Sequence, residues 1–332
     1  MFIERVNTHK HLGVYLNSAL DWSKHIHEVC LKANRKPSVL RSVKLLHRKT
    51  LDLLFKVTVR SVIDYALPIY ANTLKQTELA RLEQLQYRAA KLVSGALHFT
   101  SREKLNNELG WESIKRRIEF LGLSLFHKIH LQETRPLIKK CMPKLDFEKK
   151  HVTRSKGGYT PFPNLGHKFL NSFFPFYSKL WNNLKHETQV KNLQDFKLQI
   201  KEDLKPEKIR HYAKGPKASN IFITRLRVGR SDLNLHKFSV GLIDKPDCDC
   251  HAKEESTIHY LLDCFLYTVE RQTLCDLVEH HVPNFSRLTR IAKIDLLLFG
   301  IKPNDPDYNH LNVVLTKAIQ TYIVQTKRFL HK

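Results

Sequence analysis

The sequence predicts a mainly α-helical protein with a short amino-terminal β-hairpin, basic linkers and a small cysteine-rich knuckle. Apolar residues recur at three- and four-residue steps over much of residues 49–131 and again near the carboxyl end, which is the period of amphipathic helices. Strict alternation of apolar and polar residues is confined to one short stretch near the start. Three of the six cysteines and two histidines gather between residues 248 and 264.

Composition excludes a disordered chain and favours an anionic partner. Of the 332 residues, 42% are hydrophobic and 10% aromatic, which suffices for packed cores. The formal net charge is +24, because 56 Lys and Arg oppose 32 Asp and Glu. Such an excess repels itself and favours a polyanionic partner, with nucleic acid as the first candidate. A membrane surface is the weaker candidate, since the basic residues run along the whole chain instead of clustering beside an anchor.

No targeting or membrane segment is recognisable. The first residues lack the apolar core of a secretory signal, and no stretch approaches the roughly 20 apolar residues of a bilayer span. The longest apolar run, Leu296 to Phe299, is interpreted as a buried turn or strand. Cys30 and Cys141 are isolated, which is typical of a reducing compartment. We expect an intracellular, soluble protein without membrane contact, in the nucleus or in a cytoplasmic ribonucleoprotein.

The first two predicted segments are a hairpin over residues 1–24 and a helical domain over residues 25–135. Alternation over residues 10–16 predicts a strand, and Asn17-Ser18 then reads as a turn. Asp21 or Ser23 can cap a helix that runs toward Ala33.

The helical domain contains the two strongest amphipathic patterns, Thr77–Ser94 and Trp111–Leu131. A basic triplet, Lys115, Arg116 and Arg117, lies near the start of the second helix. Cations at this end oppose the helix dipole, so an external anion is one interpretation of the triplet and a plain solvated face is the other.

Residues 136–220 are predicted to be basic linker around an aromatic mini-core. Helical periodicity fails from Pro136 to Pro163, and a second basic linker covers residues 201–217. Between them lie clustered aromatic residues, including Phe173, Phe174 and Trp181. These rings could stack on unpaired bases, but packing in a small core is the commoner arrangement and is the one we predict.

Residues 221–275 combine an arginine-rich segment with the knuckle. Arg225, Arg227 and Arg230 cannot all be buried without partners, and they precede the cysteines closely enough to form one unit with them. A helix is predicted from about residue 267 to 280. The last segment, residues 276–332, is predicted to be helical from about residue 311 to 329, with Lys327-Arg328 suiting the helix carboxyl end.

The knuckle has the pattern C-x-C-x8-H-x4-C. Its four candidate ligands are Cys248, Cys250, His259 and Cys264. Such a set can hold a zinc ion tetrahedrally with no open position, which indicates a structural rather than a catalytic site. The first two cysteines are expected on a tight strand or turn. His251 and Cys275 are alternative ligands, and Cys264 could instead be a small core residue.

In the order of these motifs the chain resembles the carboxyl-terminal part of the polyprotein of a LINE-like (non-LTR) retrotransposon, with a reverse transcriptase of the jockey-like type. The resemblance covers nearly the whole length. The motifs that carry it are Lys10 to Val14 with Leu20-Asp21-Trp22, Val59 to Ala66, Leu82 to Ala90, Ser172 to Pro175 with Trp181-Asn182, and Arg225 to Gly229 before the CCHC knuckle.

This resemblance implies primer-grip-like strands, a thumb-like helical bundle and a knuckle that handles nucleic acid. It implies phosphate contacts from the arginine segment, the basic triplet and Lys10 of the primer-grip-like strand. The family's paired catalytic aspartates have no counterpart here, and two catalytic divalent ions would lack ligands, so we expect no polymerase activity. A nuclease is not expected either, because Pro306-Asp307 lacks a second acid about a dozen residues on. We therefore predict no catalytic residues and no enzyme.

The leading functional hypothesis is a retroelement tail that binds RNA or DNA mainly through phosphates and holds structural zinc, with a palm-bearing reverse transcriptase as a candidate partner. A second hypothesis is a zinc-stapled protein-interaction or scaffold module. A third is a non-functional truncated remnant, since a fragment that starts after the palm is what truncation would produce.

Overall fold

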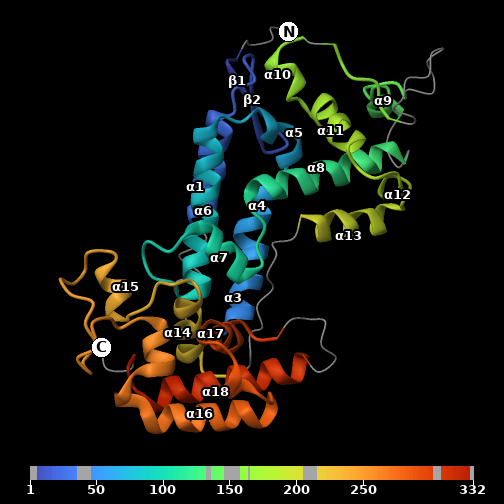
Figure 1. The fold of residues 1–332 in the computed structure, drawn as a ribbon. Helices are drawn as coiled ribbons and strands as arrows, with labels where there is room; N and C mark the ends of the chain where they lie inside the picture. The colour runs from blue at the N-terminus through green and yellow to red at the C-terminus, as the bar shows by residue number, and fades with distance from the viewer. Residues whose placement is uncertain are drawn as a thin grey trace. The chain divides into compact units, whose positions relative to one another are not determined.

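The computed structural model describes residues 6–35, 46–131, 136–145, 158–163, 165–204, 215–301 and 308–329 (Figure 1). The described chain is mainly helical and contains one two-stranded hairpin, which confirms the predicted fold class in its helices and strands. It divides into two compact units, each assembled from three stretches of sequence. The first unit comprises Met1–Val43, Leu53–Arg88 and Glu112–Pro206, and the second comprises Lys44–Asp52, Ala89–Trp111 and Glu207–Lys332. Among the described helices, none combines the length and the apolar character needed to cross a membrane.

A hairpin is present in the first unit as predicted, but its turn lies at Leu12-Gly13 and not at Asn17-Ser18, so residues 10–16 do not form one strand. Strands β1 (Thr8–His11) and β2 (Val14–Asn17) pair antiparallel, with Thr8 opposite Asn17 and His11 opposite Val14. Gly13 has φ +85°, a conformation that favours glycine, and it forms the tight turn between the strands. The hydroxyl of Tyr65 donates a hydrogen bond to the carbonyl of Leu12 at 2.5 Å, which ties the turn to a helix of the same unit.

The helices of the first unit are α1 (Ser23–Arg35), a π-helix (Lys56–Arg60), α4 (Ser61–Asp64), α5 (Leu67–Tyr70), α8 (Ile114–His130), α9 (Pro136–Lys139), α10 (His167–Leu170), α11 (Phe173–Asn182), α12 (His186–Gln189) and α13 (Leu193–Asp203). Helices α1 and α8 lie on predicted helical stretches, whereas α9 to α13 lie in residues 136–220, for which linker and an aromatic mini-core were predicted. Two further helices, α3 (Arg48–Phe55) and α6 (Gln76–Ser94), contain residues of both units. The amide of Ser23 donates to the Asp21 carboxylate at 2.9 Å where α1 begins.

The clustered aromatic residues pack on α8, as the mini-core interpretation predicts. Helices α11 and α13 both contact α8 (Figure 1). The buried rings of Tyr177, Trp181 and Phe196 lie in one cluster with Phe126 of α8. A methyl group at Gly122 would overlap the Tyr177 ring, so the absence of a side chain there lets α11 approach.

The predicted linkers are more ordered than their composition indicates. Tyr159 is buried in the aromatic cluster and its hydroxyl hydrogen-bonds His130 at 2.7 Å, so the expectation of an exposed linker is wrong at this residue. The beginning of the second predicted linker is also helical, because α13 continues to Asp203. The side chain of Ile200, near the end of this helix, is buried. The basic residues Lys149, Lys150, Arg154 and Lys156 lie outside the described residues, as do residues 205–214.

The helices of the second unit are α7 (Arg102–Leu109), α14 (Lys217–Arg227), α15 (Asn234–Phe238), α16 (Thr268–His281), α17 (Arg290–Phe299) and α18 (Tyr308–Gln325). Helices α16 and α18 are the two predicted carboxyl-terminal helices, whereas α14, α15 and α17 were not predicted from the sequence. Helices α16 and α18 lie side by side (Figure 1). Their core includes the buried residues Leu274, Val278, Ile319 and Ile323.

Helix α17 corrects the interpretation of Leu296 to Phe299 as a turn or strand. A short apolar run has no periodicity that separates a buried strand from a buried helix. The capping residue decides the outcome, because the Thr289 hydroxyl accepts from the Ala292 amide at 3.3 Å and the helix starts at Arg290, well before the apolar run.

The three stretches of the second unit meet at one buried carboxylate. Glu108, at the end of α7, is 3% exposed and accepts from Arg48 of α3 and Arg227 of α14, each at 3.3 Å. Thr224 donates to the same oxygen at 3.4 Å, and the Arg227 Nε donates to the carbonyl of Leu298 in α17. Two cations with hydrogen-bonded partners therefore neutralise the buried acid, which is the condition under which a buried charge is tolerated.

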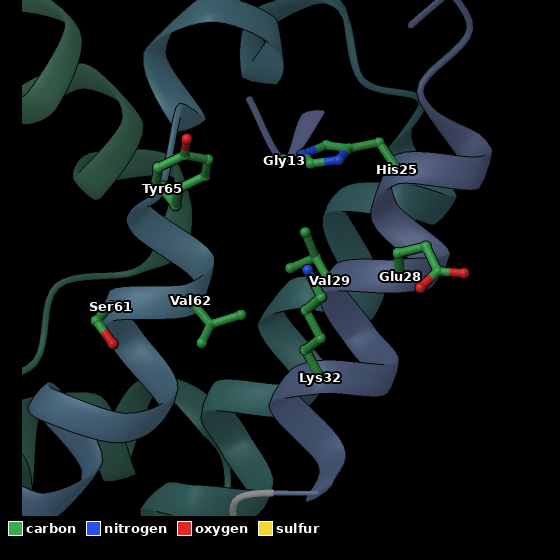
Figure 2. A pocket seen from close by; sticks show the side chains of 8 residues that line it. All are labelled: Gly13, His25, Glu28, Val29, Lys32, Ser61, Val62 and Tyr65. Atoms are coloured by element: carbon green, nitrogen blue, oxygen red, sulfur yellow. The ribbon is translucent and has the colours of Figure 1, made fainter. Parts of the chain in front are cut away.

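A cavity of about 260 Å³ lies beside the hairpin in the first unit (Figure 2). Val29 of α1 and Val62 of α4 give it an apolar wall, and Glu28 and Lys32 of α1 contribute the charged groups. The ring of His25 extends from α1 toward the turn at Gly13. His25 is 2% exposed and packs edge-on to Tyr70, with 4.7 Å between ring centroids.

His25 makes the stability of the protein sensitive to acid. Burial, with the nearby charge of Lys32, lowers the pKa of His25 from its ordinary value of 6.5. Below that value the unfolded chain takes up a proton that the folded chain resists, so the free energy of unfolding falls as the pH falls. We expect His25→Phe to make this fall shallower in urea denaturation across a pH series.

The matched control is His27→Phe, an exposed position on the same helix, which should keep the wild-type pH dependence. Parallel pH curves for wild type and His25→Phe would contradict the assignment, whatever their absolute stabilities.

Candidate metal centre

The structure brings the four predicted ligands together in the second unit. The ligand atoms of Cys248, Cys250, His259 and Cys264 all lie within 4.8 Å of one another. The Cys248 and Cys264 Sγ atoms are 3.7 Å apart, and the Cys250 Sγ is 3.1 Å from the His259 Nε2. With Zn–S bonds of about 2.3 Å, two sulfurs of a tetrahedral site are separated by roughly 3.7 Å. The cluster is therefore close to the size of a metal site, and it could hold a metal ion.

Two local backbone motifs produce this arrangement. A tight turn carries the cysteine pair: the His251 amide donates to the Cys248 carbonyl at 2.8 Å, and the Cys248 amide donates to the Ala252 carbonyl at 2.9 Å. His259–Asp263 forms a π-helix, and the Cys264 amide donates to the His259 carbonyl at 2.8 Å. This i→i+5 bond brings residues five apart onto one side of the helix, which an α-helix would separate.

The donor set suits a soft or borderline divalent cation. Cys264 is fully buried, and Cys248 and Cys250 are 6% and 7% exposed. Burial raises the pKa of the Cys248 thiol to about 12 and also raises that of Cys264. A bound cation reverses this effect because it stabilises thiolates directly, so binding releases protons from the ligands. Neither alternative ligand, His251 or Cys275, belongs to this group among the described residues.

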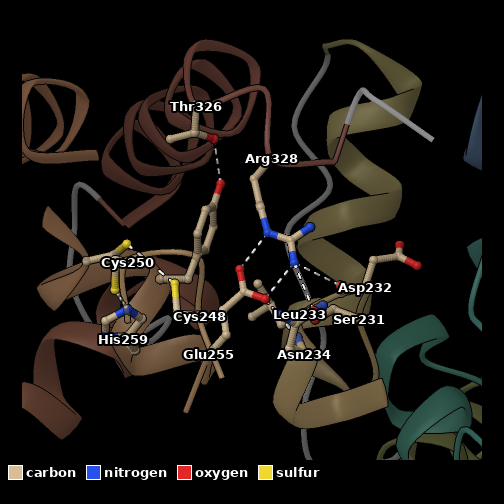
Figure 3. Close-up of polar contacts among 12 residues, drawn as sticks. Ser231, Asp232, Leu233, Asn234, Cys248, Cys250, Glu255, His259, Thr326 and Arg328 are labelled. Atoms are coloured by element: carbon tan, nitrogen blue, oxygen red, sulfur yellow. Dashed lines mark hydrogen bonds and ion pairs between the residues drawn. The ribbon is translucent and has the colours of Figure 1, made fainter. Parts of the chain in front are cut away.

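A second buried charge pair holds the cysteine loop in place (Figure 3). Glu255, 3% exposed, accepts from the Nε and Nη2 of Arg328, each at 2.5 Å. The same carboxylate accepts from the amide of Asn234, where α15 begins, at 2.8 Å. The Glu255 amide in turn donates to the carbonyl of Pro246, two residues before Cys248, at 2.8 Å. One side chain thus fixes the loop against the segment that follows α18.

Arg328 therefore has a different role from the one its position in the sequence suggests. Helix α18 ends at Gln325, and Arg328 lies beyond it, paired with Glu255 instead of interacting with the helix end. Sequence reasoning missed Glu255 altogether. A single acid beside a basic carboxyl terminus has no spacing rule that would reveal such a long-range pair.

The three arginines of residues 225–230 have three different environments. Arg227 is 7% exposed and is held by Glu108 and Leu298, so it faces the interior. Arg225 pairs with Asp232 at 2.7 Å and donates to the Gly95 carbonyl at 3.0 Å. Arg230 donates to the Ser239 hydroxyl at 3.0 Å and to a backbone carbonyl, which are neutral acceptors. Phosphate contact by the three arginines stays a prediction, and within the described residues the Arg227 guanidinium is already bonded to Glu108 and Leu298.

The end of α14 explains why Arg230 differs. Gly229, with φ +68°, follows the helix, and the Arg230 amide donates back to the Arg225 carbonyl at 2.9 Å. This Schellman-type ending turns the chain away from the helix axis. Lys104 of α7, which sequence reasoning missed, donates to the Val228 carbonyl at 3.3 Å and so lies beside the same turn.

The remaining predicted cations belong to the first unit. Arg117 forms a bidentate ion pair with Asp64, with donor–acceptor distances of 2.6–3.2 Å, so its guanidinium is bonded to an acid of the same unit. Arg116 is exposed and donates to the Leu204 carbonyl at 3.4 Å, and Lys115 is exposed. The Lys10 ammonium lies 5.6 Å from the centre of the Tyr15 ring. These cations are therefore not part of the metal centre.

No protein-family model, curated protein or solved structure matches this chain. The Pro306-Asp307 pair weighed in the nuclease argument lies outside the described residues.

The Glu255–Arg328 pair makes a sharp stability prediction. Glu255→Gln leaves the buried Arg328 cation without its counter-charge, which should cost about 3 kcal/mol of unfolding free energy. Chemical denaturation followed by circular dichroism measures this loss. Glu254→Gln, the exposed neighbour with the same change in charge, should stay within about 0.5 kcal/mol of wild type. Equal effects of the two substitutions would show that net charge, and not the pair, is responsible.

Proposed function

We propose that the chain is a nucleic-acid-binding protein similar to the carboxyl-terminal region of a non-LTR retrotransposon reverse transcriptase, without polymerase or nuclease activity. It binds RNA or DNA mainly through phosphates. The observation that carries the proposal is the pair of cations at the end of α14. Lys104 and Arg230 lie beside the Gly229 turn, and the hydrogen bonds described for them go to neutral acceptors.

The neighbourhood of this pair is electropositive. The pKa of His236 is lowered first by burial and then by the charges of Arg230 and Lys104, so both cations act on the same imidazole. A net charge of +24 adds long-range attraction for a polyanion. Phosphate oxygens would supply the anionic partners that the described protein groups do not.

We propose zinc as the ion of the cysteine cluster, in a structural role. Three thiolates and one imidazole form a closed tetrahedral shell, a set typical of zinc. A bound ion would widen the short Cys250–His259 contact to roughly 3.5 Å. The ion would hold the loop that follows the arginine segment and so fix the position of Arg230 relative to α15.

The test is a binding titration with single-stranded RNA, single-stranded DNA and duplex DNA at several salt concentrations. Wild-type affinity should fall linearly with salt on logarithmic axes. The double variant Lys104→Gln/Arg230→Gln should bind about tenfold more weakly at low salt, and its salt slope should be smaller by between about 1 and 2.

The control is Lys253→Gln/Lys317→Gln, which removes two exposed cations elsewhere in the second unit. This variant should keep most of the affinity and slope. If wild type binds no nucleic acid at low salt, the proposal fails. If both double variants lose affinity equally, binding reflects overall charge and not this site.

A zinc-stapled scaffold is the second candidate, because the four ligands are buried or half-buried, as they would be in a cluster that serves only folding. Chelation distinguishes the two functions when thermal stability and RNA affinity are measured on the same sample. If the protein binds nucleic acid as proposed, thermal stability and RNA affinity should both fall on chelation and both return when zinc is restored, because the cluster would hold the Gly229 turn in place. Loss of stability with full retention of RNA affinity would make the cluster only a folding staple and would favour the scaffold.

A further inference from the structure

The second unit also contains a cavity, of about 320 Å³, which lies next to the candidate metal centre. Helices α16 and α17 contribute most of its lining. The lining residues are Leu262, Asp263, Arg271, Gln272, Cys275, Arg290 and Lys293. Three of these side chains are cations and one is an acid, so the wall carries a net positive charge.

The cations differ in how far they are neutralised. Arg290 pairs with Asp263 at the rim, and this pair is largely self-compensating. Arg271 donates to the Cys264 carbonyl at 2.6 Å and to the Thr268 hydroxyl at 3.2 Å, both of them neutral acceptors. The Lys293 ammonium lies 5.6 Å from the centre of the Phe285 ring, another neutral group. Arg271 and Lys293 thus face the cavity without an ion-pair partner among the described residues.

Nearby acids are occupied elsewhere. Asp276 accepts from Gln272 at 2.8 Å, and the Glu279 carboxylate accepts from the amides of Asn284 and Ser286 at 2.9 and 2.6 Å. Neither acid lines the cavity. Two cations fixed on adjacent helices, with a partly apolar wall at Leu262, match a small anion that carries an organic group.

We propose that this cavity binds a phosphate group, held between Arg271 and Lys293. Arginine offers a planar set of donors to an oxyanion, and lysine adds a point charge. A cavity of this size has room for a phosphomonoester as well as for phosphate itself. The site is separate from the Lys104–Arg230 pair and does not depend on the proposed nucleic-acid binding.

Occupancy would also be linked to the metal centre. Arg271 contacts the backbone carbonyl of the ligand residue Cys264, so a phosphate that orders Arg271 also orders the end of the π-helix. By linkage, each ligand should then favour binding of the other.

Cys275 provides a direct probe, because its half-buried thiol lines the same cavity. In zinc-loaded full-length protein, inorganic phosphate should slow alkylation of Cys275 by N-ethylmaleimide, read by peptide mass spectrometry. The slowing should reach about tenfold at a phosphate concentration roughly ten times the dissociation constant, while chloride at equal ionic strength should have no such effect.

Three variants make the test specific. Lys293→Gln should lose the protection, Lys293→Arg should retain it, and Lys317→Gln, an exposed lysine of α18, should behave as wild type. Equal alkylation in phosphate and chloride for wild type, or undiminished protection in Lys293→Gln, would overturn the proposal.

The source of the phosphate group is distinguished by oligonucleotides. A strand with a 5′-phosphate that protects Cys275 better than the same strand with a 5′-hydroxyl identifies a strand end as the ligand. Protection by inorganic phosphate alone identifies a small free anion. Both results support the phosphate site, and failure of this test leaves the titration of the Lys104–Arg230 site unaffected.

Discussion

The carboxylate of Glu108 is the constraint on which the second unit depends. The unit is assembled from three separate stretches of sequence, and Glu108 receives Arg48 from the first and Arg227 from the third. Removing the Glu108 carboxylate would leave the buried Arg227 guanidinium without its counter-charge, at a cost of about 3–5 kcal/mol. The cysteine cluster and the second-unit cavity belong to the same unit.

This use of charge changes the meaning of the chain's basic composition. Part of the excess cationic charge has a structural role: Arg227, Arg117 and Arg328 each hold a buried or half-buried acid. Lys104 and Arg230 differ from these, because the hydrogen bonds described for them go to neutral acceptors. Net charge alone therefore does not tell structural cations from those that lack an ionic partner within the described residues.

The amphipathic helices and the metal ligands could be predicted from the sequence because local rules determine both. Apolar residues at three- and four-residue steps predicted the stretch that forms α6. The types and spacing of the candidate ligands predicted the cluster that includes Cys264. The helical nature of α17 could not be predicted, because an apolar run of four residues fits a strand as well as a helix.

Charge pairs between residues far apart in the sequence could not be predicted either. Glu255 and Arg328 are separated by 73 positions, and no periodicity joins them. The different environments of the arginines could not be predicted either. Arg227 and Arg230 are nearly adjacent in sequence, but the helix ends before Gly229, so Arg227 is buried and Arg230 lies at the turn. Tertiary context, and not residue type, decides these roles.

Two of the boundaries between the units fall inside α3 and α6, and each unit draws on three stretches of the chain. A genetic breakpoint anywhere between residues 45 and 205 would therefore divide both units at once. Neither could be inherited, exchanged between genes or lost as one contiguous block.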